Sequence, residues 1–348
     1  MAQHSADLPY RRDDTRARPA SEAPPGARTR TGFARHYAAL DLGTNNCRLL
    51  IARPQGDGFA VVDAFSRIVR LGEGLATSGR LSDAAIERTI GALRICSDKL
   101  KRRNVTLARS VATEACRRAS NGADFIARAY DETGIHLDVI TAEEEARLAV
   151  LGCHVLLEPG NAPALVFDIG GGSTELVLID TSATVPTVID WHSAPWGVVS
   201  LTESTAGGDG PAGLAAVYER MRGLVRESFS PFAARLPRFE GPRRLLGTSG
   251  TVTTLASVHL GLDRYDRAQV DGLIAPSDSM RAISQRLAHL SIAERALLPC
   301  IGRERADLVV AGCAILETIL DLWPAERLGV ADRGIREGIL RRLMATAR

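Results

Sequence analysis

Two short segments combine an acid, glycines and small hydroxyl residues in a pattern that suits phosphate binding. In each, an Asp ends an apolar run and glycine follows, and glycines let backbone N–H groups approach an oxyanion closely. A tight hairpin turn is the alternative use of such glycines, but three consecutive glycines exceed what a turn requires. We therefore predict phosphate binding by Asp41, Gly43, Thr44 and Asn45 in the first segment and by Gly170, Gly171, Gly172, Ser173 and Thr174 in the second.

A third segment has residues suited to the same kind of site. Gly247, Ser249 and Gly250 lie between an expected strand and an expected helix, where free N–H groups and the helix dipole favour a phosphate. Arginine must supply cationic contacts, because only two of the 43 Lys and Arg residues are lysines. The candidates are Arg48, Arg117 and Arg305, and a solvent-exposed surface position is the alternative for each.

Glu145 is the candidate for proton transfer. It closes an acidic run, residues 143–145, at the start of an expected helix. Thr141 and Glu144 match a capping box, and Glu143 lies where the helix dipole favours an anion, so both acids have structural explanations. Glu145 instead borders the apolar stripe of the helix, which leaves a surface acid or a group that faces a cleft.

Composition excludes several classes of protein. The 348 residues, 45% hydrophobic and 24% charged, are typical of a globular chain with two domains. Residues 1–35 hold seven Arg and four acids, so the rest of the chain is near neutral, and we expect no specific nucleic-acid partner. Neither Lys99 nor Lys101 follows a G-x-x-x-x-G pattern, which excludes a P-loop NTPase.

The chain is expected in the cytoplasm, with no membrane partner. It has neither an apolar run long enough to span a membrane nor the apolar core of a secretion signal. Its six cysteines are scattered and form no C-x-x-C pair, so we predict neither disulfides nor a zinc site.

Strands and helices alternate from Tyr37 onward, which predicts an α/β fold with largely parallel sheets. Residues 1–35 are expected to form a disordered basic tail, because they are rich in Pro and Arg and almost lack apolar residues. Strands are expected at 37–41, 48–52, 59–68, 107–112, 136–140, 164–168, 174–179, 185–191 and 244–246, and helices at 82–103, 124–132, 143–157, 214–229, 251–258, 279–290, 307–322 and 335–346.

The two halves of the chain open with similar sequences. Residues 41–51 and 168–178 match at a constant offset of 127 residues, from Asp-x-Gly into an apolar strand. This repeat predicts two facing copies of one unit, with chance similarity of two turns as the alternative. The predicted domains are residues 36–157 and 158–334, with the C-terminal helix 335–347 completing the first.

Six segments, in order along the chain, resemble the signature segments of the exopolyphosphatase / guanosine pentaphosphate phosphohydrolase (Ppx/GppA) family. They are DLGTN (41–45), TEACRRASN (113–121), EEEAR (143–147), DIGGGSTE (168–175), GTSGT (247–251) and DRGIREG (332–338). The resemblance runs from about Tyr37 to the C-terminus. It implies the actin/Hsp70/sugar-kinase (ASKHA, ribonuclease H-like) type of fold, with the active site in the cleft between two α/β domains.

The resemblance also implies roles for individual residues. Glu145 corresponds to the general base of the family. Glu175 corresponds to the glutamate that positions water and phosphate. A divalent cation, usually Mg²⁺, is implied next to Asp168, with Glu175 as a further ligand.

The expected activity is hydrolysis of the terminal phosphoanhydride of inorganic polyphosphate. Guanosine pentaphosphate (pppGpp), a substrate of the stringent response, is the alternative, because it ends in the same kind of bond. The chain ends ten residues after Gly338, whereas longer members continue into a helical region. This departure mildly favours polyphosphate but argues against highly processive handling of very long chains.

Two readings outside hydrolysis are weaker. A sugar kinase would need a second catalytic Asp motif, and none is apparent. A non-catalytic ASKHA nucleotide-binding regulator would not need both Glu145 and Glu175. The sequence leaves a homodimer open.

Overall fold

The structure is a computed structural model that describes residues 35–348 except 161, 206–209, 238–240 and 347–348. The predicted tail, residues 1–35, therefore lies outside the described residues apart from Arg35. Residues from Arg35 onward form one compact unit. The predicted division at residues 157 and 158 stays a prediction.

The first sheet has five strands in the order β3-β2-β1-β4-β5. β1 pairs antiparallel with β2, which pairs antiparallel with β3, whereas β4 and β5 continue parallel to β1. The strands are β1 (His36–Leu42), β2 (Asn46–Gln55), β3 (Gly58–Ile68), β4 (Val105–Ala112) and β5 (Leu137–Val139).

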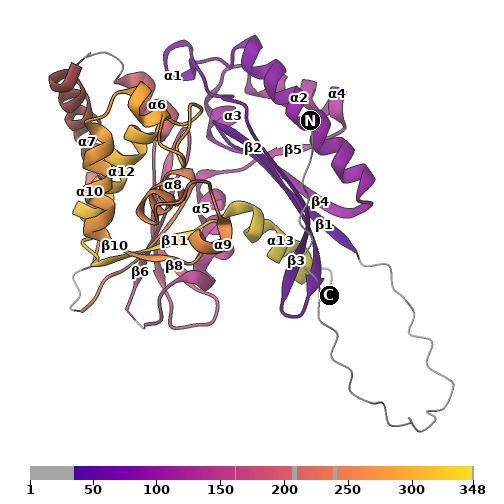
Figure 1. Ribbon diagram of the computed structural model, residues 1–348. Helices are drawn as coiled ribbons and strands as arrows, with labels where there is room; N and C mark the ends of the chain where they lie inside the picture. The colour runs from indigo at the N-terminus through magenta and orange to yellow at the C-terminus, as the bar shows by residue number, and fades with distance from the viewer. Residues whose placement is uncertain (1–34, 161, 206–209, 238–240, 347–348) are drawn as a thin grey trace, which may run out of the picture. The chain divides into compact units, whose positions relative to one another are not determined.

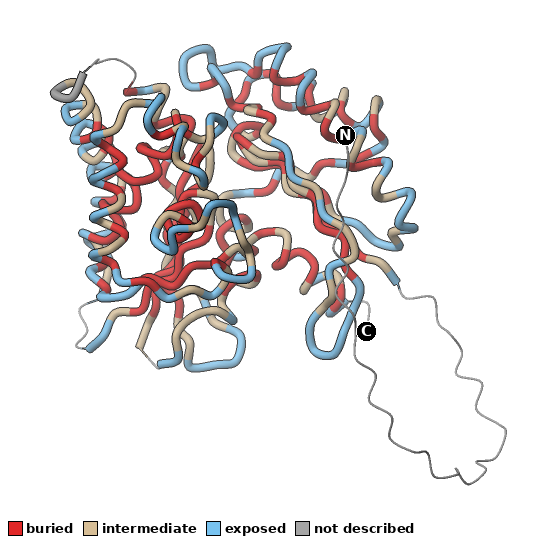
Figure 2. Tube along the Cα trace, in the orientation of Figure 1, coloured by how far each residue is buried: buried red, intermediate tan, exposed pale blue. Residues whose placement is uncertain are grey.

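β1 is buried along most of its length (Figure 2), and its successive side chains point to opposite faces of the sheet. Ala38, Leu40 and Leu42 belong to a core shared with α2 (Asp83–Arg102) and α4 (Gly122–Thr133). Tyr37 and Ala39 face the other side, where α5 (Ala142–Cys153) and α13 (Ile335–Thr346) complete a second core.

The second sheet has six strands in the order β10-β11-β9-β6-β7-β8. α6 (Val198–Ser204), α7 (Gly210–Ala233), α8 (Gly250–His259), α10 (Ser277–Ala288) and α12 (Val309–Leu322) contribute to the large core on one face. The strands are β6 (Ala164–Ile169), β7 (Thr174–Asp180), β8 (Thr187–Ala194), β9 (Arg244–Thr248), β10 (Ile274–Pro276) and β11 (Arg327–Ala331).

Helix α5 packs against both sheets. Leu148 and Ala149 belong to the first sheet's core, and Ala146, Val150 and Cys153 pack against strands of the second sheet. This double packing fixes the start of α5, where Glu143–Glu145 lie, relative to both sheets (Figure 1).

Helix α13 crosses α5 at close range. A Cβ at Gly338 would lie 2.1 Å from the Leu148 carbonyl oxygen, so only glycine fits at this crossing.

The repeat predicted from the sequence is confirmed at the level of strand register. Asp41 pairs with Arg48 in the first hairpin, and Asp168 pairs with Glu175 at the equivalent position of the second. The α/β fold is confirmed, but the expectation of largely parallel sheets is wrong. Both sheets are mixed, because each half opens with antiparallel hairpins and β10 runs antiparallel to β11.

The longer predicted elements are present, with ends shifted by a few residues, and Ser82 caps α2 as expected. The helix expected to reach Leu157 ends at Cys153 and continues as a short 3-10 helix, η1 (His154–Leu156). Sequence patterns missed α6, β10, β11 and four short helices. These helices are α1 (Leu75–Ser78), α3 (Glu114–Arg118), α9 (Arg267–Val270) and α11 (Ile292–Ala296).

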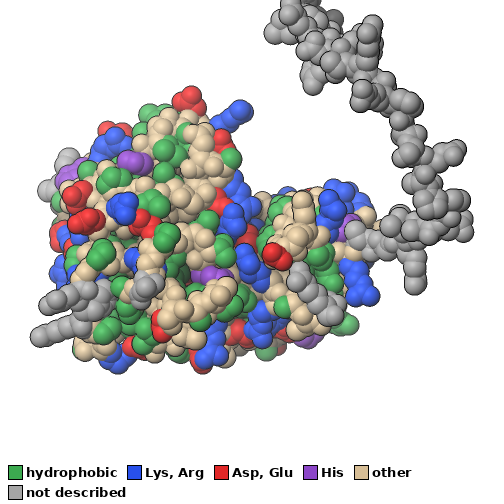
Figure 3. Space-filling model, turned by 90° about the horizontal axis from the view of Figure 1, so that it is seen from below, with side chains coloured by type: hydrophobic (Ala, Val, Ile, Leu, Met, Phe, Trp, Pro, Cys, Tyr) green, Lys and Arg blue, Asp and Glu red, His purple; other side chains and the backbone are tan. Residues whose placement is uncertain are grey.

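Three further observations concern the surface charge, the helices and the cysteines. Charged side chains of both signs are distributed over the face seen from below (Figure 3). Among the described residues, none of the helices is long and apolar enough to cross a membrane. The six cysteines are free thiols.

Candidate active site

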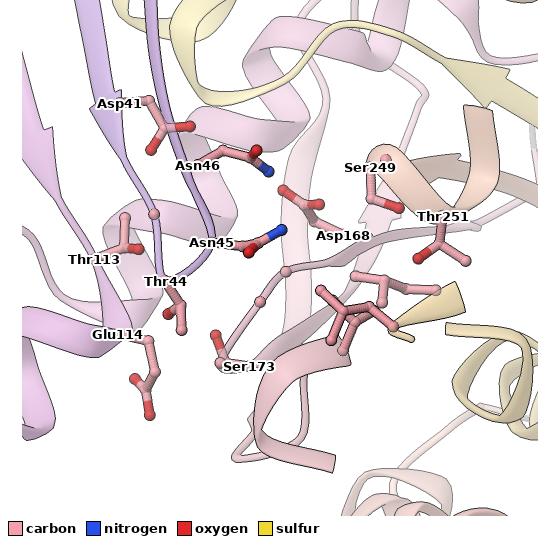
Figure 4. Close-up of a pocket in the computed structure, with 18 of the residues that line it drawn as sticks. Asp41, Thr44, Asn45, Asn46, Thr113, Glu114, Asp168, Ser173, Ser249 and Thr251 are labelled. Carbon is pink, nitrogen blue, oxygen red and sulfur yellow. The ribbon is translucent and has the colours of Figure 1, made fainter. Parts of the chain in front are cut away.

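A pocket of about 130 Å³ lies where the two hairpin turns face each other. Asp41 comes from the end of β1, and Thr44 and Asn45 come from the turn that follows it; Asp168 comes from the end of β6, and Ser173 comes from the turn that follows it (Figure 4). The start of α8 and the turn before α12 close the pocket with Ser249, Gly250, Thr251, Thr254, Arg305, Leu308 and Val309.

Most of the predicted site residues line this pocket. They are Asp41, Gly43, Thr44, Asn45, Arg48, Glu145, Asp168, Gly170, Gly171, Gly172, Ser173, Ser249, Gly250 and Arg305. Four predicted residues, Arg117, Thr174, Glu175 and Gly247, are not among its lining residues.

The two glycine turns have the same geometry and touch each other. Gly43 N donates to the Asn46 carbonyl oxygen and Gly170 N to the Ser173 carbonyl oxygen, each at 2.9 Å. A Cβ at Gly172 would lie 2.6 Å from Thr44 Oγ1, so only glycine fits between the turns. These glycines therefore let the two halves of the pocket approach each other, in addition to any role toward a ligand.

Glu145 lies in the first turn of α5 and is only 7% exposed. Arg117 Nη1 donates to Glu145 Oε2 at 2.9 Å. Burial and the neighbouring Glu175 raise the pKa of Glu145 well above its ordinary value, against the opposing effect of Arg117. Of the two sequence alternatives, the surface acid is wrong, because this carboxyl is buried and lines the pocket.

Three further carboxyl groups surround the pocket: Glu175 is buried, and Asp41 and Asp168 are half-buried. Burial and the charges of Glu145 and Asp41 raise the pKa of Asp168 to about 7. Burial and the charge of Asp168 raise the pKa of Glu175 to about 7 as well. Burial also raises the pKa of Asp41, and its Oδ1 atom has no hydrogen-bond partner among the described residues.

Glu175 lies behind the pocket wall rather than in it. Its Oε1 atom accepts hydrogen bonds from Ser173 Oγ at 2.8 Å and from Ser193 Oγ at 2.9 Å. Ser173 lines the pocket, so Glu175 orients a pocket hydroxyl through this bond.

The pocket carboxylates fit a divalent cation for which water and substrate oxygens supply most of the ligands. The described residues contain no group of three or more His, Cys, Asp or Glu side chains that could hold a metal. Mg²⁺ commonly binds through one or two carboxylates plus waters and phosphate oxygens. Asp168 and Asp41 offer such carboxylates in the pocket, whereas Glu175 would act from behind it.

Arg117 is held by protein groups. Its guanidinium donates to the Ile140 carbonyl oxygen at 2.7 Å and to Glu114 Oε2 at 2.9 Å, in addition to Glu145. Arg117 thus holds Glu145 through a hydrogen bond and is not among the residues that line the pocket, and its predicted phosphate contact stays a prediction. Arg305 and Arg48 do line the pocket, and Arg305 Nη1 donates to Thr254 Oγ1 at 2.9 Å.

Two other predicted residues have packing roles. A Cβ at Gly247 would lie 2.4 Å from the Phe167 ring, so this glycine makes room for a core aromatic residue. Thr174 Oγ1 donates to the Trp196 carbonyl oxygen at 2.7 Å. The predicted capping box is only half present: Thr141 Oγ1 accepts from Glu144 N, but the Glu144 carboxylate pairs with Arg109 and Arg342.

Sequence reasoning missed several pocket residues. Thr113 and Glu114 directly follow β4, which runs parallel to β1, so both strands end at the same edge of the sheet. That position was a signal, because ligands of α/β sheets bind at the carboxyl ends of strands. The others are Asn46, Ile169, Val198, Thr251, Thr254, Leu308, Val309 and Ile335.

The fold and the pocket together define an ASKHA-like α/β protein: two mixed sheets, each opened by a hairpin whose glycine turn reaches a shared, acid-lined pocket. The sequence pattern of the Ppx/GppA phosphatase family matches residues 50–347. The chain belongs to this family.

Individual relatives agree with that assignment. Exopolyphosphatase 2 of Mycobacterium tuberculosis is 35% identical over 316 residues, which cover 87% of this chain and 96% of the relative. The crystal structure of the Aquifex aeolicus Ppx/GppA family member has 28% identity and a TM-score of 0.74, with 90% of this chain and 99% of that chain covered. An exopolyphosphatase structure from Cytophaga hutchinsonii, at 23% identity, shows the same fold with a TM-score of 0.79, covering 90% of this chain and 98% of that chain.

Proposed function

We propose that this chain is an exopolyphosphatase that hydrolyses the terminal phosphoanhydride of inorganic polyphosphate and releases phosphate. The observation that carries the proposal is the buried Glu145 carboxyl at a pocket formed by two glycine turns. The relative named exopolyphosphatase 2 supports the choice of substrate.

The pocket residues suit the binding of a terminal phosphoryl group. Backbone N–H groups of the two turns and the hydroxyls of Thr44 and Ser249 supply donors, and Arg48 and Arg305 supply positive charge. Because phosphoryl transfer requires little covalent chemistry from the protein, such positioning and electrostatics account for most of the acceleration.

Glu145 acts as the general base in this mechanism. A water oxygen attacks the terminal phosphorus, the bridging P–O bond breaks, and the shortened chain leaves with the bridging oxygen. Glu145 takes a proton from the attacking water. A carboxylate whose pKa is raised by burial is a stronger base than one in water, and Arg117 keeps it oriented.

A divalent cation, Mg²⁺ in the family pattern, would be held by Asp168 with help from Glu175 behind the wall. When bound, it offsets negative charge on the phosphate oxygens. The pocket carboxylates alone would repel the negatively charged substrate. The arginines and this cation would together offset that repulsion.

The experiment compares phosphate release from long-chain polyphosphate and from guanosine pentaphosphate, with Mg²⁺ present. The two substrates are supplied at equal concentrations of terminal phosphoanhydride groups. The proposal expects polyphosphate to have the higher kcat/KM. A higher kcat/KM for guanosine pentaphosphate would make that nucleotide the preferred substrate instead. Binding of either compound without release of phosphate would indicate a non-catalytic regulator.

A further inference from the structure

The segment of residues 69–75, which follows β3, supports the first glycine turn from behind. Val69 N and Arg70 N both donate to the Asn45 carbonyl oxygen, at 2.9 and 3.0 Å, and Gly72 N donates to the Thr44 carbonyl oxygen at 2.9 Å. A Cβ at Gly72 would lie 2.3 Å from Thr44 Cγ2. A movement of this segment therefore moves the turn that lines the pocket.

The same segment is bound to the half of the molecule that carries the second sheet. Arg70 Nη1 donates to Asp307 Oδ2 at 2.9 Å, and Nη2 donates to Asp307 Oδ1 at 3.4 Å and to the Glu304 carbonyl oxygen at 3.3 Å. Gly74 N donates to Glu203 Oε1 at 2.8 Å, and Glu203 belongs to α6. Two separate contacts thus connect the segment to that half.

Asp307 belongs to the turn that presents Arg305 to the pocket. Leu308 N and Val309 N both donate to the Arg305 carbonyl oxygen at 3.0 Å, so the turn is compact. Arg305, Leu308 and Val309 line the pocket. Asp307 therefore belongs to the compact turn from which Arg305 reaches the pocket, where its guanidinium donates to Thr254 Oγ1.

The backbone conformation of Arg70 indicates that contacts with neighbouring groups hold this residue in position. Its φ of 47° lies in the left-handed region, which residues other than glycine rarely adopt. Arg88 holds the segment, because its Nε donates to the Val69 carbonyl oxygen at 3.0 Å and its Nη2 to Glu73 Oε2 at 2.6 Å.

The ion pair between Arg70 and Asp307 is partly exposed, so solvent weakens its contribution to stability. The side chains of Arg70 and Asp307 are 33% and 30% exposed, and water screens a pair that is this accessible. The contact therefore contributes more to position than to stability.

We propose that Arg70 is a positioning residue that ties the first glycine turn to the turn carrying Arg305, and so sets the distance between the two walls of the pocket. The effect on turnover rests on the proposed function, whereas the tie itself does not.

The kinetic test uses Arg70→Gln, Asp307→Asn and the charge exchange Arg70→Asp with Asp307→Arg. Each single change should lower kcat/KM for polyphosphate by about 10- to 100-fold, mainly through KM, because misplaced binding groups weaken substrate positioning. The exchange should recover much of the loss.

Arg235→Gln is the matched control, because Arg235 makes a similar two-point pair with Asp190 and its side chain is also partly exposed. It should leave KM unchanged. Unchanged KM in both single variants, or an exchange that loses as much as the two single changes together, would overturn the proposal.

A second measurement needs no substrate. Hydrogen exchange at the Gly74 and Val309 amides should accelerate in Arg70→Gln and Asp307→Asn, with melting temperatures close to that of the unmodified chain, and should not change in Arg235→Gln. Unchanged exchange at both amides would contradict the tie. If the unmodified chain releases no phosphate but exchange responds as expected, the proposed function fails and the tie stands.

Discussion

Arg48 shows how a single side chain in the pocket can be tested for its chemistry. Arg48 pairs in register with Asp41, and both line the pocket. Arg48→Lys keeps the charge but loses the planar fork that contacts two phosphate oxygens, so we expect kcat/KM to fall about 10-fold or more. Steady-state phosphate release measures this. Arg53→Lys, an exposed change on the same strand, should have no effect, and full activity of Arg48→Lys would place Arg48 outside the phosphate site.

Gly172 is a second residue with a sharp steric requirement. Gly172→Ala would place a methyl group 2.6 Å from Thr44 Oγ1 and 3.0 Å from Glu114 Cγ, forcing the two turns apart. We expect a loss of kcat/KM of about 10- to 100-fold, because the donors of both turns shift by a fraction of an ångström or more.

Gly91→Ala is the control for the glycine change. Gly91 lies within α2 with nothing within 4 Å of the added Cβ, so the change should raise the free energy of unfolding by about 1 kcal/mol and leave activity unaltered. Equal activity of Gly172→Ala and the unmodified chain would show that the turns tolerate separation.

Among the elements, β3 and α2 are joined by an ion-pair cluster that makes stability depend on pH. Asp63 of β3 accepts from Lys99 Nζ at 2.7 Å and Arg103 Nε at 2.9 Å. The hydrogen bond from Lys99 is the main reason that the pKa of Asp63 falls to about 2, from an ordinary 3.8. Because the pKa is lowered in the folded state, the stabilisation is fully present above pH 3.8 and is lost as pH falls through about 2.

Asp63→Asn removes this dependence. Denaturant unfolding should show the unmodified chain more stable than the variant at pH 6, with the difference shrinking between pH 4 and pH 2. A difference that stays constant across that window would mean that the cluster contributes through packing or geometry rather than through charge.

Element patterns also explain what the sequence could and could not predict. The hairpins at residues 41 and 168 were predictable, because an acid, a glycine and an apolar strand repeat with one spacing. Each hairpin implies one antiparallel pair, but the general rule for alternating strands and helices still led to the expectation that the sheets are largely parallel. Short helices such as α3 and α11 carry too few turns for an apolar period to show.

Across the whole molecule, the candidate site was predicted where a residue's role depends on its own turn and missed where it depends on packing. Glu145 was singled out by its place beside the apolar stripe of its own helix, whereas the role of Asp168 came from the family resemblance. The bonds that Arg117 makes to both Glu114 and Glu145 could not be predicted, because these two residues come together only when α3 packs beside the start of α5. The sequence around Gly247 is typical of a phosphate-binding turn, but the structure shows that this glycine makes room for the Phe167 ring.

The whole-molecule account depends on one group, the Glu145 carboxyl that both sheets bring to the pocket through α5. Its most direct test is the turnover number for polyphosphate hydrolysis with Mg²⁺, measured for the unmodified chain, Glu145→Gln and Glu144→Gln. Glu145→Gln keeps the shape of the side chain but loses the proton acceptor, so kcat should fall by ~10²–10⁴ with little change in KM. Glu144→Gln, which loses only partly exposed ion pairs, should keep kcat within about two-fold. An unchanged kcat in Glu145→Gln would contradict the mechanism and leave Glu145 as a buried structural acid.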